Sequence, residues 1–475
     1  MLKNIIEQMF VDRHQPFTAL SFCLLATLPI FFIPHPAALL SLPVLFFGSL
    51  IIIRKPFVVC MLFIMFSFFR IHEVFPTLKV INIPEWAALV SYAMLLYLTL
   101  TNKNKIYWRR EHTAFAIFFG WVLLSVIVSD SPHKAFNSFT STFLKIGIML
   151  LVITWLMIDR FYFNLFHIVT LFSGLAVGYV ALYNSVNGIG IVEGSRVTIP
   201  GALGDPNDLS LVLSFPMGYA IAFIMTKGTG KLRTILGLIG FIVFMTSIIA
   251  TQSRGGLLAI VAVLVVFGFR IIRSRLLLLI IGSICLMVLV AAAGISDRKS
   301  GGASEEGVGA SIMGRIHAWE TALHMGLRNP ITGVGLSLFL NNYWDYATHS
   351  RAEGKAHVTH STWFQVLAEA GIVGFAIFIH LIVTVFMSIR SSLERLDRNK
   401  GSPEYDPLMT ATTVGTYAGL VGFCVSGSFL SQGFLWPVYI ITAISIAIAN
   451  YMDKHFPKET SEAGSNQSVK TPGKN

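Results

Sequence analysis

The sequence predicts an all-α, polytopic integral membrane protein, and three observations lead to that fold class. The chain has 475 residues, of which 54% are hydrophobic and 12% charged, whereas soluble chains carry about 25% charged residues. Its mean hydropathy is +0.70. Long apolar runs recur along the chain without the polar–apolar alternation of transmembrane β-strands. A bundle of membrane-spanning helices is therefore expected.

Hydropathy predicts about 14 spans, or 12–14 if short runs merge, because a helix needs about 20 apolar residues to cross a bilayer. An even number of spans puts both chain ends on the same side. The predicted spans are 18–34, 38–53, 57–70, 84–101, 113–129, 139–158, 164–183, 209–226, 233–250, 257–272, 276–295, 363–389, 408–427 and 433–451.

The distribution of positive charge predicts the orientation of these spans. Of the 35 lysines and arginines, 23 lie in the termini or in loops on the same side, and the opposite loops hold 11. Because the richer side is usually cytoplasmic, both termini are expected to be cytoplasmic. Orientation also accounts for the net charge of +11, so no nucleic-acid partner is expected.

The long outward loop contains a helical pattern over 312–328, expected to lie on the membrane surface or on the bundle. Its apolar stripe comprises Ile312, Ile316, Trp319 and Leu323, with Arg315, Glu320 and Arg328 on the side that faces water.

The spans and loops divide the chain into four regions. These are an N-terminal transmembrane bundle (1–295), a large outward loop (296–361), C-terminal transmembrane helices (362–452) and a disordered cytoplasmic tail (453–475).

No metal or other cofactor is expected. The outward loops contain no paired acidic motif of the DxD kind, which disfavours a metal-bound diphosphate. The cysteines all fall inside apolar runs, where they are interpreted as small packing residues. They are Cys23, Cys60, Cys285 and Cys424.

Arg254 lies in the short outward turn TQSRGG, where orientation does not require a positive charge. Gly255 and Gly256 follow it, and a helix starts at Leu257. Glycines allow close approach of a ligand, and a helix N-terminus favours anions, so the turn suits a phosphate. The alternative is an interfacial arginine that reaches lipid phosphates.

Arg196 precedes the segment GALGDPNDLS in another outward loop. Pro206 is typical of a first helical residue, with Asp205 as N-cap and Asp208 reaching back as in a capping box. This structural interpretation of the two aspartates competes with a catalytic one. Asn207 is a candidate to orient Arg196 or a ligand.

His360 lies at the entry of a predicted span, near the outer interface. A structural role is the alternative to a catalytic one. Glu369, further into that span, requires a cavity or a partner, because a carboxylate in hydrocarbon is costly. Other histidines compete for any role given to His360: His317, His349 and His357.

Topology places Arg196, Arg254 and His360 on one outward face, although they come from three separate loops. Two cations beside a candidate base suggest the handling of a phosphate-bearing lipid. Nearby cations are expected to lower the histidine pKa, which keeps the ring neutral and able to accept a proton.

Several of these stretches resemble the O-antigen ligase and polymerase superfamily of bacterial envelope glycosyltransferases. The resemblance covers about residues 195–375, and RKPFVVCMLFIMFSFFRIHEVFP adds a weaker one. The subgroup it most resembles is that of the exosortase-associated O-glycosylation ligases. The matching stretches are SRVTIPGALGDPNDLS, TQSRGGLLA, GRIHAWETALHMGLRNPITGVGLSLF and THSTWFQVLAEAGIVGF.

The resemblance implies a GT-C-like bundle in the bacterial inner membrane with a periplasmic active site. It implies inverting, metal-independent transfer of a glycan from undecaprenyl diphosphate to a lipid, protein or glycan acceptor, in lipopolysaccharide or exopolysaccharide biosynthesis. In this family Arg196 and Arg254 correspond to diphosphate-binding residues, and His360 to the base. Arg315 matches a further basic position with no assigned role.

Other functions stay open on the sequence alone. A polysaccharide polymerase of the same superfamily uses the same donor and differs in its acceptor. A lipid-linked glycan transporter is disfavoured, because transporters usually carry internal repeats and polar residues at the bilayer midplane. A non-catalytic assembly factor is the remaining alternative. The ionisable residues inside the spans are few, chiefly Lys145, His167 and His380.

Overall fold

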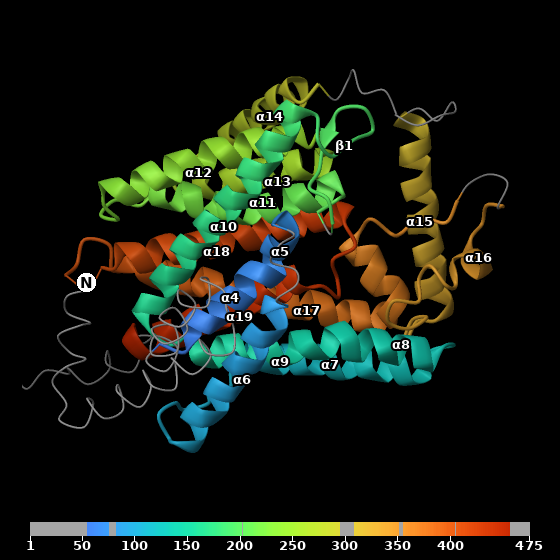
Figure 1. Ribbon diagram of the computed structural model, residues 1–475, viewed down its shortest axis with the longest axis horizontal. Coiled ribbons are helices and arrows are strands. Elements are labelled where there is room, and N and C mark those ends of the chain that lie inside the picture. Colours follow the sequence, from blue (N-terminus) through green and yellow to red (C-terminus); the bar gives the residue numbers. More distant parts are fainter. Residues whose placement is uncertain are drawn as a thin grey trace, which may run out of the picture.

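The computed structural model describes residues 55–75, 82–201, 203–294, 308–350, 355–403 and 405–456. This part of the chain is almost entirely helical (Figure 1). Its strands are β1 (Ile191–Val192) and β2 (Arg196–Val197), an antiparallel pair. The helices are α4 (Phe57–Phe68), α5 (Ile71–Val74), α6 (Ile83–Leu100), α7 (Arg110–Val128), α8 (Pro132–Ser138), the π-helix η3 (Phe139–Phe143), α9 (Leu144–Leu156), α10 (Arg160–Asn187), α11 (Pro206–Met225), α12 (Lys231–Ala250), α13 (Arg254–Gly268), α14 (Arg275–Ala292), α15 (Val308–Arg328), α16 (Tyr343–Tyr346), α17 (Thr362–Arg398), α18 (Pro407–Ser426), the 3₁₀-helix η5 (Gly427–Phe429) and α19 (Trp436–His455).

The polytopic all-α class is confirmed. Within the described ranges, nine helical segments are long and apolar enough to cross a membrane, and α4 and α13 are shorter apolar helices. Every predicted span from residue 57 onward coincides with a helix. The predicted spans 18–34 and 38–53 lie outside the described residues, as do the start of the long loop and the tail beyond residue 456.

Most residues of helices α11 and α19 are buried inside the bundle. In the most apolar 18-residue stretch of α11, 83% of the residues are buried. The helix packs against α12, α13 and α18. A helix that is apolar all round belongs inside a bundle in this way. Small residues let α11 and α18 approach closely, because a Cβ on Gly218 would lie 2.9 Å from the carbonyl oxygen of Gly415. This close packing fixes the position of α11 against α18.

Helix α17 bends sharply at Gly371, whose φ of 74° and ψ of 179° are not helical. A Cβ at this position would lie 2.5 Å from the carbonyl oxygen of Ile331, so only glycine fits. On one side of the bend is the short first part of α17, and the long remainder crosses the bundle. The bend thus sets the direction of the segment that follows His360.

Helix α15 forms where the sequence predicted a helix in the long loop. It runs across the direction of α7 (Figure 1) and packs against α17. The predicted apolar stripe forms only part of the contact: Trp319 stacks on Phe364 of α17 with ring centroids 5.4 Å apart, whereas Ile316 and Leu323 remain 43% and 42% exposed. Small side chains allow closer approach to α17 than large ones do. The buried face consists of Ala318, Thr321, Ala322, Met325 and Gly326.

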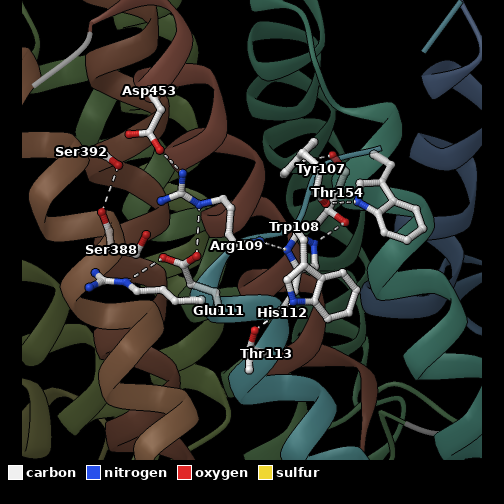
Figure 2. A network of polar contacts seen from close by, with 12 residues as sticks. Tyr107, Trp108, Arg109, Glu111, His112, Thr113, Thr154, Ser388, Ser392 and Asp453 are labelled. Carbon is white, nitrogen blue, oxygen red and sulfur yellow. Dashed lines mark hydrogen bonds and ion pairs between the residues drawn. The ribbon is translucent and has the colours of Figure 1, made fainter. Parts of the chain in front are cut away.

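Figure 2 shows a polar network where α7 begins and α19 ends. It includes the end of α17, whereas His360 precedes the start of that helix. The fully buried carboxylate of Glu111 accepts a hydrogen bond from Arg109 Nε at 3.1 Å. Arg109 also contacts Asp453. From α17, Arg395 Nη1 donates to Asp453 Oδ1 at 2.7 Å. These charged contacts tie α7, α17 and α19 together.

Candidate functional site

A cavity of about 310 Å³ lies between the β1–β2 hairpin, the start of α11, α15 and the segment before α17. It brings together side chains from four places far apart in the sequence. The predicted candidates Arg196, Asn207, Arg315 and His360 all line it, whereas Arg254 and Glu369 are not among its lining residues. The charged and polar side chains of the wall are Glu193, Arg196, Asp205, Asn207, Arg315, His357 and His360.

Arg196 is held rigidly at the start of β2, with only 4% of its surface exposed. Its Nε donates to the Thr251 carbonyl at 2.9 Å, and its Nη1 contacts Glu193 Oε1 at 3.2 Å. Its Nη2 donates to Asn207 Oδ1 at 3.0 Å. A guanidinium has five N–H donors, so two of them have no partner among the residues that the structure describes.

Asn207 joins this arginine to the next helix. Its Oδ1 also accepts a hydrogen bond from Ser253 Oγ at 2.7 Å, and its Nδ2 donates to Asp205 Oδ1 at 2.8 Å. Ser253 is the N-cap of α13 and accepts from the backbone N–H of Gly256. One amide side chain thus connects the hairpin, the start of α11 and the start of α13.

The N-terminus of α11 follows the sequence prediction in part. Asp205 is the N-cap, and its Oδ1 accepts from the backbone N–H of Asn207 at 2.7 Å. The predicted capping box is wrong, because Asp208 does not reach back to the cap. The Oδ1 atom of Asp208 accepts from Gln432 Nε2 at 2.7 Å, which ties α11 to the segment before α19.

Arg254 is the first residue of α13 and is exposed. Within the described part of the chain it makes no hydrogen bond or ion pair. Its charge acts on Arg196: burial lowers the pKa of Arg196 to about 10, Asp205 opposes this shift, and Arg254 adds to it. Arg196 is still protonated at neutral pH, so two cations lie close together at this end of the bundle.

The two glycines after Arg254 have a packing role. A Cβ on Gly256 would lie 2.5 Å from the Cβ of Ser210, and one on Gly255 would lie 3.0 Å from Phe429. The sequence suggested instead that they let a ligand approach. Gly256 allows α13 to pack closely on α11, and Gly255 allows it to pack on Phe429 of η5, so the start of α13 is fixed at Arg254.

His360 is half-buried and has a left-handed backbone, with φ 41°. Its neighbours are fixed: Trp319 Nε1 donates to the Thr359 carbonyl at 2.8 Å, and Thr362 Oγ1 donates to the Leu430 carbonyl at 2.8 Å. In the described ranges no hydrogen bond engages the His360 ring. The imidazole is therefore positioned by its backbone and remains available to a ligand in the cavity.

The surroundings of His360 favour its neutral form. Burial lowers the pKa of His360 most, and the charges of Arg315 and His357 lower it further, while Asp205 raises it. The sequence predicted that Arg196 and Arg254 would lower this pKa, whereas the cations that lower it are Arg315 and His357, and burial is the larger cause. A neutral imidazole at physiological pH is able to accept a proton.

Glu369 lies away from the cavity, just before the bend of α17. Its Oε2 accepts from the backbone N–H of Ser337 at 2.8 Å. The carbonyl of the same residue accepts from Ser125 Oγ at 2.8 Å. These contacts supply the partner that a buried carboxylate requires, and they fix the loop after α15.

The sequence alone did not reveal two features of this cavity. Glu193 pairs with Arg196 three residues later, a spacing that could have indicated the contact. Thr251 takes part through its backbone carbonyl, for which no side-chain signal exists. Among the described residues, His, Cys, Asp and Glu side chains form no group of three or more able to hold a metal ion.

The fold and the cavity define a polytopic membrane protein with a cationic, histidine-containing site at one end of its helices. The family model described as O-antigen ligase matches residues 239–379. Over this range the chain resembles the O-antigen ligase family, which supports the O-antigen ligase and polymerase superfamily that its motifs suggested. The matched range contains Arg254, Arg315 and His360, and Arg196 precedes it. No curated protein matches the chain.

Proposed function

We propose that this protein is a membrane glycosyltransferase that moves a glycan from undecaprenyl diphosphate to an acceptor hydroxyl on the periplasmic face. The observation that supports this most is the cavity shared by Arg196, Arg315 and His360. Cations and a neutral imidazole are the groups that such a transfer requires. The family match supports the same class of enzyme.

In this proposal the donor diphosphate lies against the arginines. Arg196 offers its two remaining N–H donors, and the exposed guanidinium of Arg254 supplies a second charge. Arginine suits phosphate oxygens because its planar fork donates two parallel hydrogen bonds. Their charge stabilises the leaving diphosphate, so no metal ion is needed for that role.

His360 acts as general base in this mechanism. The acceptor oxygen attacks the anomeric carbon from the face opposite the diphosphate, and its proton passes to the imidazole. The bond between the anomeric carbon and the phosphate oxygen breaks, and the diphosphate leaves with the electron pair. Attack from the opposite face inverts the anomeric configuration. A general base of this kind contributes about 10²–10⁴ to the rate.

The orientation follows from the charge of the loops. With both termini cytoplasmic, the β1–β2 hairpin and α15 face the periplasm. Asn207 holds Arg196 in place, and Arg315 brings a further cation from α15. Glu369 acts only indirectly, through the loop that it fixes.

The experiment that tests this function measures lipid-linked glycans in cells lacking the protein, complemented with wild type or His360→Ala. Accumulation of long chains on undecaprenyl diphosphate in both the deletion and the His360→Ala cells would indicate a ligase. Accumulation of single repeat units would indicate a polymerase. His133→Ala, on the exposed surface of α8, is the matched control and should restore the wild-type pattern.

A normal glycan pattern in cells with His360→Ala would overturn the proposed role of this residue. That result would favour the transporter or the assembly factor. The acceptor, whether lipid, protein or glycan, follows from identifying which molecule loses its glycan in the deletion.

A further inference from the structure

Asp205 faces the cavity with one oxygen unused. As N-cap of α11 it accepts from the backbone N–H and from the side-chain Nδ2 of Asn207, at 2.7 and 2.8 Å. Both bonds go to Oδ1. Within the described residues Oδ2 has no hydrogen-bond partner, and the half-buried side chain lines the same cavity as His360. The capping role therefore explains the position of Oδ1 but gives no function to Oδ2.

Asp205 differs in sign from the other groups whose charges act on His360. Arg315 from α15 and His357 from the preceding segment line the cavity, and both disfavour a protonated imidazole. Arg196, from the hairpin, is a further cation, but it pairs with Glu193 at 3.2 Å. Asp205 is the carboxylate whose charge favours protonated His360.

We propose that Asp205 is a positioning residue that stabilises the imidazolium of His360 formed when the acceptor hydroxyl is deprotonated. This inference rests on the proposed function and adds a role that the capping bonds do not explain. The positive charge that Asp205 stabilises forms on the imidazole only while the glycan is being transferred.

The proton balance shows where Asp205 acts. The acceptor oxygen forms its bond to the anomeric carbon while its proton moves to the His360 ring, and the diphosphate departs with the electron pair of the broken bond. At that point the imidazole carries a new positive charge, with Arg315 nearby. The negative charge of Asp205 offsets this repulsion. Water then removes the proton, and the neutral ring is restored.

Asp205→Asn separates this role from helix capping. Asparagine is as good an N-cap as aspartate, because its side-chain oxygen accepts the same backbone N–H. The substitution thus keeps the start of α11 and removes only the charge. If Asp205 did not act on His360, the variant would keep the pH midpoint of wild type, because the other charge effect of Asp205, on Arg196, does not involve the imidazole.

The test measures the rate of transfer against pH for the full-length protein. Membranes from deletion cells contain the accumulated lipid-linked glycan and the acceptor, and purified wild type or variant is added to them. The initial loss of lipid-linked glycan is followed from about pH 5 to pH 9, the range in which a histidine titrates. Thermal unfolding of each purified variant is recorded in parallel.

For Asp205→Asn we expect a rate about tenfold lower and a midpoint of the acidic limb at lower pH. Loss of a neighbouring negative charge lowers the pKa of His360 and makes it a weaker base. Arg315→Gln is expected to move the midpoint in the opposite direction. Glu193→Gln, which removes the other carboxylate of the cavity, should leave the midpoint in place whatever its rate.

An unchanged midpoint for Asp205→Asn, with thermal unfolding also unchanged, would overturn the inference. Equal midpoint shifts for Asp205→Asn and Glu193→Gln would overturn it too, because the effect would then be general to the charge of the cavity. Failure of the proposed function looks different: wild type would show no transfer, or His360→Ala would retain it.

Discussion

Arg196 donates from Nη2 to the side-chain oxygen of Asn207 at 3.0 Å, so two buried polar residues from separate elements form one unit. The same oxygen accepts from Ser253 at the start of α13. The place of Arg196 in the cavity therefore depends on where α11 and α13 begin. The amide acts as a junction between the hairpin and two helices.

Asn207→Ala should destabilise the protein by about 1–3 kcal/mol, because Arg196 and Ser253 would lose their shared acceptor while buried. Activity should also fall, since the guanidinium would no longer be fixed. Thermal unfolding and transfer rate would measure the two effects. Asn187→Ala, which removes an exposed hydrogen bond to Tyr183, is the control and should change neither. Equal unfolding temperatures of Asn207→Ala and Asn187→Ala would contradict the role of Asn207 in joining the hairpin to the two helices.

Gly256→Ala should move α13 away from α11. Its Cβ would lie 2.5 Å from the Cβ of Ser210, and overpacking of this kind costs about 1–3 kcal/mol. Because Ser253 and Arg254 begin α13, activity should fall together with stability. Gly120→Ala is the matched control, as its Cβ would meet nothing within 4 Å. A wild-type unfolding temperature for Gly256→Ala would disprove the packing role.

Much of the helical organisation was predictable, because hydrophobic length is a local property of the sequence. Pro206 marked the start of α11, and Asp205 marked its cap, as the structure has them. Apolar runs from residue 57 onward predicted the helices that form. These signals need no knowledge of which helices pack together.

The contacts between elements were less predictable. Asp208 matched a capping box, yet it binds Gln432 from a segment more than two hundred residues away. Of the predicted stripe on α15, Trp319 stacks on Phe364 of α17, but Ile316 and Leu323 stay exposed. The carboxylate of Glu369 was a candidate for the site, and it binds the backbone at Ser337 instead. Such partners depend on tertiary packing, which one sequence does not reveal.

Glu111→Gln should destabilise the bundle without altering the chemistry at its other end. The buried carboxylate pairs with Arg109, and removing one partner of a buried pair costs on the order of 3 kcal/mol. Thermal unfolding should therefore occur at lower temperature. The transfer rate per folded molecule should equal that of wild type. Glu394→Gln, on the exposed face of α17, breaks only a surface pair with Arg390 and should be neutral. A transfer rate per folded molecule below that of wild type in Glu111→Gln would show that this network also affects the chemistry at the other end of the bundle.

Chelation of divalent ions should leave transfer unchanged, because the proposed mechanism neutralises the diphosphate with arginine side chains. The measurement compares initial rates in EDTA-treated and untreated membranes. Addition of Mg²⁺ or Mn²⁺ after EDTA should have no effect either. A loss of rate that either ion restores would show that the arginines do not suffice.

Arg254→Gln and Arg196→Gln should both lower the transfer rate, by on the order of 10², since each removes a cation from the leaving diphosphate. Their effects on stability should differ. Arg196 is buried and bonded to three residues, so its loss removes the Nε donor of the Thr251 carbonyl and leaves Asn207 Oδ1 with Ser253 alone. Arg254 is exposed, and Arg254→Gln should unfold at the wild-type temperature.

Arg273→Gln provides the control for both variants, because Arg273 is exposed in the turn between α13 and α14. It should keep the wild-type rate and stability. If Arg254→Gln transfers glycan at the wild-type rate, the exposed arginine contacts lipid phosphates and not the donor. If Arg196→Gln loses stability alone, its guanidinium serves the fold and the diphosphate must bind elsewhere in the cavity.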